Sequence, residues 1–166
     1  MGTYQDRVDY FRGLATANLK VAHSATQKKF YTMDIEELYT ALRNDLPAPD
    51  RGPFVVFINY IREVKQKHVQ INDLQMGLVF MQGYAPQDWQ QEETARNNSE
   101  IVLDEFLNKM KSDSENGHPL FNYSFDTIKA RITPYSGASN IGFVGWMVTF
   151  PSLSGYNCTH NSANWL

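Results

Sequence analysis

The run FVVFINY, residues 54–60, decides the fold, because nearly all of its residues are β-branched or aromatic. Pro53 stands before it, as suits the entry to a strand. A second run, IGFVGWMVTF at residues 141–150, has the same character. Its glycines, Gly142 and Gly145, leave room for another backbone or a large ring to lie close. Both runs predict strands that are buried.

Between these two runs the sequence predicts another strand and a long helix. Alternating apolar residues predict a strand over roughly 74–84, with Leu74, Met76, Leu78 and Phe80 on one face. A parallel crossover would need about a dozen intervening residues, so an antiparallel hairpin is the simplest expected arrangement of the two strands. Residues 61–66 between them turn polar, as for a strand that extends past its core into solvent or toward another subunit.

The long helix is expected from Pro86 to about Met110, because apolar residues recur at helical spacing. Its predicted apolar side is formed by Trp89, Ile101, Val102, Phe106, Leu107 and Met110. A glycine and a proline in SDSENGHP, residues 112–119, are helix-stop signals. Residues 121–132 alternate with a change of parity, which predicts a bulge or break near Asp126 and Thr127 before the last strand.

The N-terminal third is expected to be helical. Apolar spacing predicts one helix over residues 4–22, and Asp34 with Glu37 forms a capping pair for a second helix that must stop by Leu46. The stretch LPAPDRGP, residues 46–53, is typical of a linker. The chain therefore divides into a helical segment (1–50), an α+β core (51–151) and a C-terminal extension (152–166). The core is expected to hold a mostly antiparallel sheet of about four strands, with helices packed on one side.

Composition narrows the class of protein. The 166 residues are 42% hydrophobic and 13% aromatic, which indicates a globular chain with a real core. The formal net charge of −3 gives no basic footprint for binding nucleic acid. Cys158 is the only cysteine, so no intrachain disulfide forms and a reducing compartment is expected. No run of residues is long and apolar enough to span a membrane.

Residues that could carry chemistry are scattered. The histidines His23, His68, His118 and His160 lack a second ligand at helical or loop spacing, which favours surface or capping roles. Cys158 and His160 form a Cys-x-His pair without further ligands or an orienting group. No serine-hydrolase elbow and no glycine-rich phosphate loop is present in the sequence. We therefore expect no catalytic residue, no metal site and no cofactor.

Tryptophans and the strand ends are the candidates for contacts between subunits. Trp89 and Trp146 sit in apolar patterns, which favours a place in the core over a binding platform. Trp165 and Leu166 follow a polar tail, and an anchor within the subunit and an anchor between subunits both fit them. The full set of candidate subunit contacts is Ile61, Arg62, Val64, Leu74, Met76, Trp165 and Leu166.

In the order of its segments, the region from Pro53 to Pro151 resembles the tail terminator or tail completion proteins of tailed bacteriophages. In that family a strand after a proline pairs with a second long strand, a long helix follows, and a hairpin with an aromatic last strand closes the domain. The comparable segments here are 54–60, 74–84, 87–110 and 143–150. The resemblance is topological and covers about 100 residues, without a diagnostic residue; the N-terminal helices and the tail after Pro151 depart from the family pattern.

The resemblance implies a structural virion protein without enzymatic activity, a homo-oligomer that forms a ring, usually hexameric, at the neck or tail end. Its implied partners are the tail tube protein and the head-connector proteins, with DNA passing through unbound. It would be found in the host cytoplasm during assembly and then in the virion. Another head–tail connector of the same particle remains an alternative, and an enzyme that uses Cys158 and His160 is a more distant one.

Overall fold

A computed structural model describes residues 4–44, 52–58, 63–65, 70–72, 75–121, 130–136 and 139–151. The elements in chain order are α1 (Tyr4–Ala17), β1 (Phe30–Met33), α2 (Ile35–Asn44), β2 (Phe54–Ile58), β3 (Glu63–Lys65), β4 (Gln70–Asn72), β5 (Gln75–Gly83), α3 (Trp89–Glu115), β6 (Arg131–Tyr135), the 3₁₀ turn η2 (Ser139–Ile141) and β7 (Phe143–Pro151). The break predicted near residues 126 and 127 lies outside the described residues.

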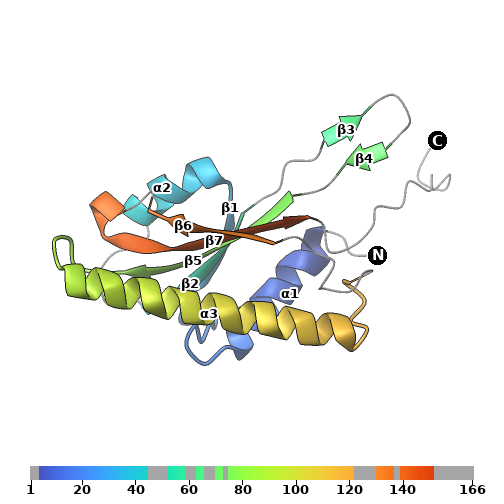
Figure 1. The fold of residues 1–166 in the computed structure, drawn as a ribbon, viewed down its shortest axis with the longest axis horizontal. Coiled ribbons are helices and arrows are strands. Elements are labelled where there is room, and N and C mark those ends of the chain that lie inside the picture. Colours follow the sequence, from blue (N-terminus) through green and yellow to red (C-terminus); the bar gives the residue numbers. More distant parts are fainter. Residues whose placement is uncertain are drawn as a thin grey trace.

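The centre of the molecule is a five-stranded sheet in the order β1-β2-β5-β7-β6, with β3 and β4 in a separate two-stranded sheet (Figure 1). Only the β1–β2 pair is parallel within the five-stranded sheet; β2–β5, β5–β7 and β6–β7 are antiparallel. The predicted α+β class, the mostly antiparallel sheet and the β2–β5 pairing are therefore confirmed. The described sheet has one strand more than expected.

The additional strand is β1, which falls within the third of the chain expected to be helical. Phe30 pairs with Val55 and Met33 with Ile58, so β1 lies along the edge of β2. Parallel neighbours need a crossover connection, and α2 lies in that connection. The N-terminal third is thus part of the sheet as well as of the helical layers.

Strand alternation divides the apolar side chains between the two faces of the sheet. Val55 and Phe57 of β2 belong to the cluster that α1 and α3 cover, whereas Phe54 and Val56 belong to the cluster that contains Leu38 of α2. Figure 1 shows α1 and α3 below the strands and α2 above them. The expectation that the helices pack on one side was wrong, because a strand that is apolar on both faces needs cover on both.

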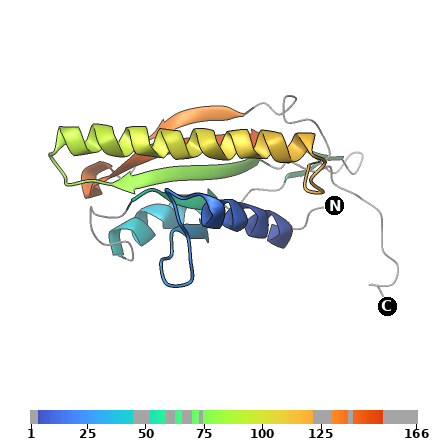
Figure 2. The same cartoon turned by 90° about the horizontal axis from the view of Figure 1, so that it is seen from below.

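Helix α3 runs along the strands (Figure 2). Asp88 caps its start by accepting the main-chain N–H groups of Gln90 and Gln91 at 3.1 and 3.0 Å. The helix continues to Glu115, past the predicted end at Met110, and stops just before Gly117, whose φ is +73°. The predicted stop signal was therefore correct, but the helix includes residues 112–115 of that segment before it ends.

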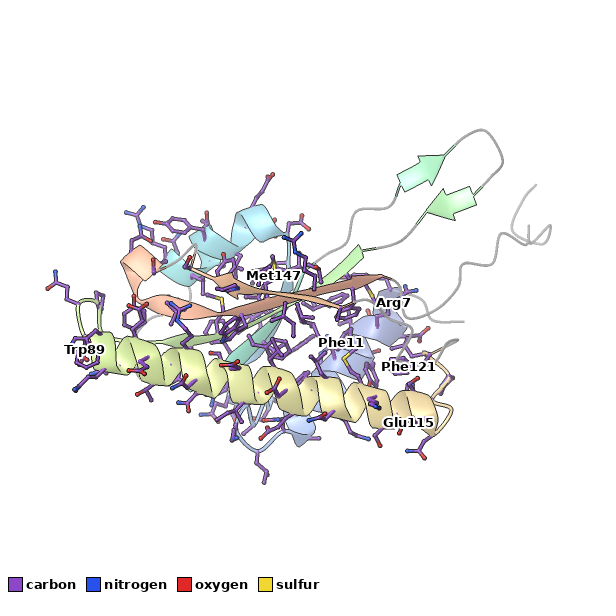
Figure 3. All side chains as sticks on the ribbon, in the orientation of Figure 1. Arg7, Phe11, Trp89, Glu115, Phe121 and Met147 are labelled. Atoms are coloured by element: carbon purple, nitrogen blue, oxygen red, sulfur yellow. The ribbon has the colours of Figure 1, made fainter. Side chains whose placement is uncertain are left out.

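Helix α1 is fixed to the rest of the core by aromatic contacts. The ring of Phe11 is fully buried and stacks on Phe57 of β2 at a centroid distance of 5.3 Å. The Tyr10 hydroxyl donates to Oδ2 of Asp113 in α3 at 3.0 Å. The helix ends at Ala17, earlier than predicted, because Oδ1 of Asn18 accepts the main-chain N–H groups of the turn that follows. Figure 3 shows Phe11 beneath the sheet.

Two glycines before and within β7 allow the close approach that their positions predicted. A Cβ on Gly145 would overlap the main-chain oxygen of Phe80 and lie 2.9 Å from Cα of Met81, both in β5. Gly142 has a φ of +81°, and a Cβ there would meet the main-chain oxygen of Tyr84 at 2.5 Å. In both cases the close neighbour is a backbone, which confirms the expected reason for these glycines.

Candidate functional site

Most of the predicted subunit contacts lie outside the residues that the structure describes: Ile61, Arg62, Leu74, Trp165 and Leu166. Val64 lies in β3, where it pairs with Ile71 of β4. Met76 pairs with Phe150 in the middle of the sheet and is 1% exposed. Its side chain is part of the core beneath α1 and α3, so it offers no surface to a second copy. The alternation correctly placed Met76 on one face of the strand with Leu78 and Phe80, but that face points into the core.

The hairpin formed by β3 and β4 lies beyond the end of the five-stranded sheet in Figure 1. Its three described pairs are Glu63 with Asn72, Val64 with Ile71 and Lys65 with Gln70. A two-stranded hairpin is at best marginally stable in water by itself. An element of this kind gains most of its stability when it packs against another surface.

Trp89 is the large aromatic residue that the structure exposes most clearly, at 68% (Figure 3). This corrects its predicted place in the core. Leu107 stands eighteen residues later, which is five full turns of helix, and so has the same angular position on α3. Leu107 packs against the core from the middle of the helix, whereas Trp89 is the first residue of the helix and remains uncovered. Ile101 was also placed on the apolar side and is 43% exposed.

Trp146 is half-buried against the core, where its pattern placed it. Its ring packs against the larger core cluster, and its Nε1–H donates to the main-chain oxygen of Arg96 in α3 at 3.2 Å. The indole therefore joins β7 to the long helix and satisfies its polar atom within the subunit.

The two histidines that the structure describes both accept main-chain hydrogen bonds. Nδ1 of His23 accepts the N–H of Lys29 at 3.1 Å, and Nδ1 of His118 accepts that of Leu120 at 3.2 Å. These contacts agree with the predicted capping roles. His68, Cys158 and His160 lie outside the described residues. Within the described ranges, no group of three or more His, Cys, Asp or Glu side chains is placed to hold a metal ion.

A hollow of about 360 Å³ lies beside β1. We call it the β1 hollow; its lining consists of Arg12, His23, Ser24, Ala25, Lys28 and the β1 residues Phe30, Tyr31, Thr32 and Met33. Burial lowers the pKa of His23, and the cations of Arg12 and Lys28 act in the same direction. Two cationic side chains thus border a short strand at the edge of the sheet.

Sequence reasoning did not identify this hollow. Arg12 comes from α1, Lys28 from the loop that follows it, and the strand between them and β2 is only four residues long. The signal present in the sequence is the short β-forming run Phe30-Tyr31-Thr32, which follows two lysines.

A second, more polar hollow of about 350 Å³ lies at the start of α3, between the end of β5 and the first helical turns. Its lining consists of Gln82, Gly83, Asp88, Gln90, Gln91 and Thr94. The carboxylate of Asp88 is already used by the helix cap. Neither hollow brings together a nucleophile, a base and an orienting group.

Comparisons with protein-family models, with curated proteins and with solved structures find no match to this chain. Among the described helices, none is both long enough and apolar enough to cross a membrane.

Proposed function

We propose that the chain is a structural subunit of a tailed bacteriophage, which joins copies of itself into a ring at the neck or the tail end and catalyses no reaction. The observation that carries this proposal is the β3–β4 hairpin, a separate two-stranded sheet next to a five-stranded one. The order of strands, long helix and closing strands that suggested the family is present in the fold. Trp89 adds an exposed aromatic side chain of the kind that anchors protein contacts.

The hairpin supports a ring because of how closed assemblies are built. In a ring each subunit presents two different surfaces, one of which receives what the neighbour extends. A marginally stable hairpin beyond the sheet is suited to be the extended part, since it becomes stable when the neighbour covers it. The tail tube and head-connector proteins are the partners expected above and below the ring, with DNA passing through its hole.

Measuring the mass of the purified chain tests the proposal. The subunit has a mass of 19.1 kDa, so a hexamer would have a mass of about 115 kDa by light scattering, with the closed symmetry usual for homo-oligomers. Negative-stain images should show a particle with a central hole. A chain that stays monomeric at all concentrations, and that is absent from virions, contradicts the proposal.

A pair of substitutions tests the role of the hairpin. Val64→Asp in β3 places a charge in the hairpin and should lower the mass to that of the monomer. Ile132→Asp is the matched control, because Ile132 is a strand residue of the five-stranded sheet that is 46% exposed. If both variants, or neither, lose the oligomer, the hairpin is not the specific contact.

A further inference from the structure

Strand β1 is an outer strand of the sheet. Its hydrogen bonds to β2 determine which of its main-chain N–H and C=O groups point away from the sheet. The N–H of Val55 in β2 donates to the main-chain oxygen of Lys29 at 2.9 Å. In a parallel pair, alternate residues of a strand bond to the same neighbour. The main-chain oxygen of Lys29 and the main-chain groups of Tyr31 therefore point toward β2, while the N–H of Lys29 donates to His23 and the main-chain groups of Phe30 and Thr32 point away from the sheet. In the described part of the chain no strand pairs with this outer side.

The β1 hollow runs along this strand, since every residue of β1 contributes to its lining. Its volume of about 360 Å³ is within the lower part of the range of sites that hold small ligands. A segment that pairs with the outer side of β1 could therefore also place a side chain in the hollow.

The charges of the hollow have one sign. Nζ of Lys28 lies 4.8 Å above the ring of Tyr31, and the guanidinium carbon of Arg12 lies 5.9 Å from the ring of Phe30. No acidic residue is part of the lining. Arg12 pairs with Asp9 on α1 at 2.7 Å, while Lys28 has no ion pair with any described residue. The hollow is therefore complementary to a carboxylate.

We propose that the outer side of β1 binds an extended acidic segment of a partner protein, which adds a strand beside β1 and places a carboxylate in the β1 hollow against Lys28 and Arg12. In this mode of recognition, main-chain hydrogen bonds supply affinity and the side-chain pocket supplies specificity. The inference goes beyond the proposed function, because it assigns a binding site that does not depend on ring formation.

The opposite outer strand explains why β1 is the side that binds. Strand β6 contains Pro134, which has no N–H to offer, and begins with Arg131. Proline and charged residues are the features by which outer strands avoid pairing with other chains. Nothing of this kind interrupts β1, whose residues are Phe30, Tyr31, Thr32 and Met33.

A protein segment fits the site better than a nucleic acid. Two cations neutralise few phosphates, and the chain carries a net charge of −3. The outward-pointing amide and carbonyl groups of β1 match the alternating donors and acceptors of another strand, which a sugar–phosphate backbone does not carry. A single-stranded oligonucleotide is therefore the contrasting probe.

The experiment is a fluorescence-polarisation titration of the full chain with labelled heptapeptides. One peptide alternates Asp or Glu with Val or Thr, and the second has Lys at each acidic position. The acidic peptide should bind, with an affinity that falls as salt is raised. The lysine peptide and an oligothymidylate of similar length should not bind over the same concentrations.

Variants locate the binding site. Lys28→Gln should weaken binding of the acidic peptide by about tenfold, while Lys111→Gln, at the exposed far end of α3, removes the same charge and should leave binding unchanged. Thr32→Pro should abolish binding, because proline removes the outward-pointing N–H at a place where an outer strand tolerates it. Circular dichroism of each variant confirms that the sheet is intact.

Several outcomes would overturn the inference. Equal binding of the two peptides, or equal weakening by Lys28→Gln and Lys111→Gln, would indicate non-specific attraction. Binding of the oligonucleotide without the peptide would identify a site for polyanions. Full binding by a folded Thr32→Pro protein would show that no strand is added at β1, and an absence of any binding would remove the site altogether.

Discussion

Replacing Gly145 by alanine is the most direct test of the central strand pairing. The new Cβ would overlap the main-chain oxygen of Phe80 and lie 2.9 Å from Cα of Met81, whereas ordinary contacts begin at 3.4 Å. Both neighbours are backbone atoms of β5, which hydrogen bonds to β7 on one side and to β2 on the other. No side-chain rotation can relieve the contact, so β5 and β7 must move apart at this point.

The expected loss in the free energy of unfolding follows from the movement of the two strands. Overpacking of a core costs about 1–3 kcal/mol, and more where the backbone has to shift. Because the close contacts are all with main-chain atoms of β5, which no side-chain movement can relieve, we expect about 3 kcal/mol or more. For a chain of this length that lowers Tm by about 6–12 °C.

The assay is thermal and urea unfolding followed by circular dichroism, at one fixed protein concentration so that assembly does not shift Tm. Gly13→Ala is the matched control, since Gly13 is exposed within α1 and a Cβ there meets nothing within 4 Å. This substitution should raise the free energy of unfolding by about 0.5–1 kcal/mol, because alanine is more stable than glycine within a helix. If Gly145→Ala unfolds as late as Gly13→Ala, β5 and β7 do not approach as described.

Three further predictions concern the attachment of α1 and the loop after it. Phe11→Ala should cost about 3–5 kcal/mol in a single cooperative transition, measured by urea unfolding, because α1 belongs to the common core. Tyr10→Phe should cost about 1–2 kcal/mol, because it leaves the Asp113 carboxylate without its hydroxyl donor. Burial, and then the Asp113 carboxylate, raise the pKa of Tyr10; stability from the neutral phenol is therefore present below its usual pKa of about 10 and lost as pH rises further. The Tyr10→Phe protein should lose less stability than the natural chain in alkaline titrations. A hydrogen bond from Lys20 lowers the pKa of Glu105, so its contribution is present above the usual value of 4.5 and lost as pH falls below it. In the Glu105→Gln protein, the free energy of unfolding should therefore fall less between pH 6 and pH 3 than it does in the natural chain. An unchanged dependence on pH would contradict the pairing of Glu105 with Lys20.

The strands that the sequence predicted most directly are those with long apolar runs. Strands β2 and β5 carry strong apolar runs that follow one another in the chain, with the β3–β4 hairpin between them, so both strands and their antiparallel pairing could be predicted. Strand β1 is four residues long and parallel to its partner, with α2 between them. A run that short has no period of its own, and it becomes a strand because β2 presents an edge to it.

Helix α3 shows a different limit of sequence reasoning. Its apolar spacing predicted the buried face near Val102 and Phe106 correctly. Spacing does not reveal which turns of the helix the core covers, and Trp89, the first residue of the helix, is left exposed. The charges of the β1 hollow, from Arg12 and Lys28, come from different elements and meet only after the fold has formed.

The two proposed surfaces make separable demands on the molecule. The ring contact is assigned to the β3–β4 hairpin and the acidic segment to the outer side of β1, and the hairpin and β1 belong to different sheets. Thr32→Pro should therefore abolish peptide binding and leave the oligomer mass at its natural value. Val64→Asp should do the reverse, lowering the mass while the isolated subunit still binds the acidic peptide. Loss of both properties in either variant would show that β1 is itself a joint between subunits, with the acidic segment competing for the same edge.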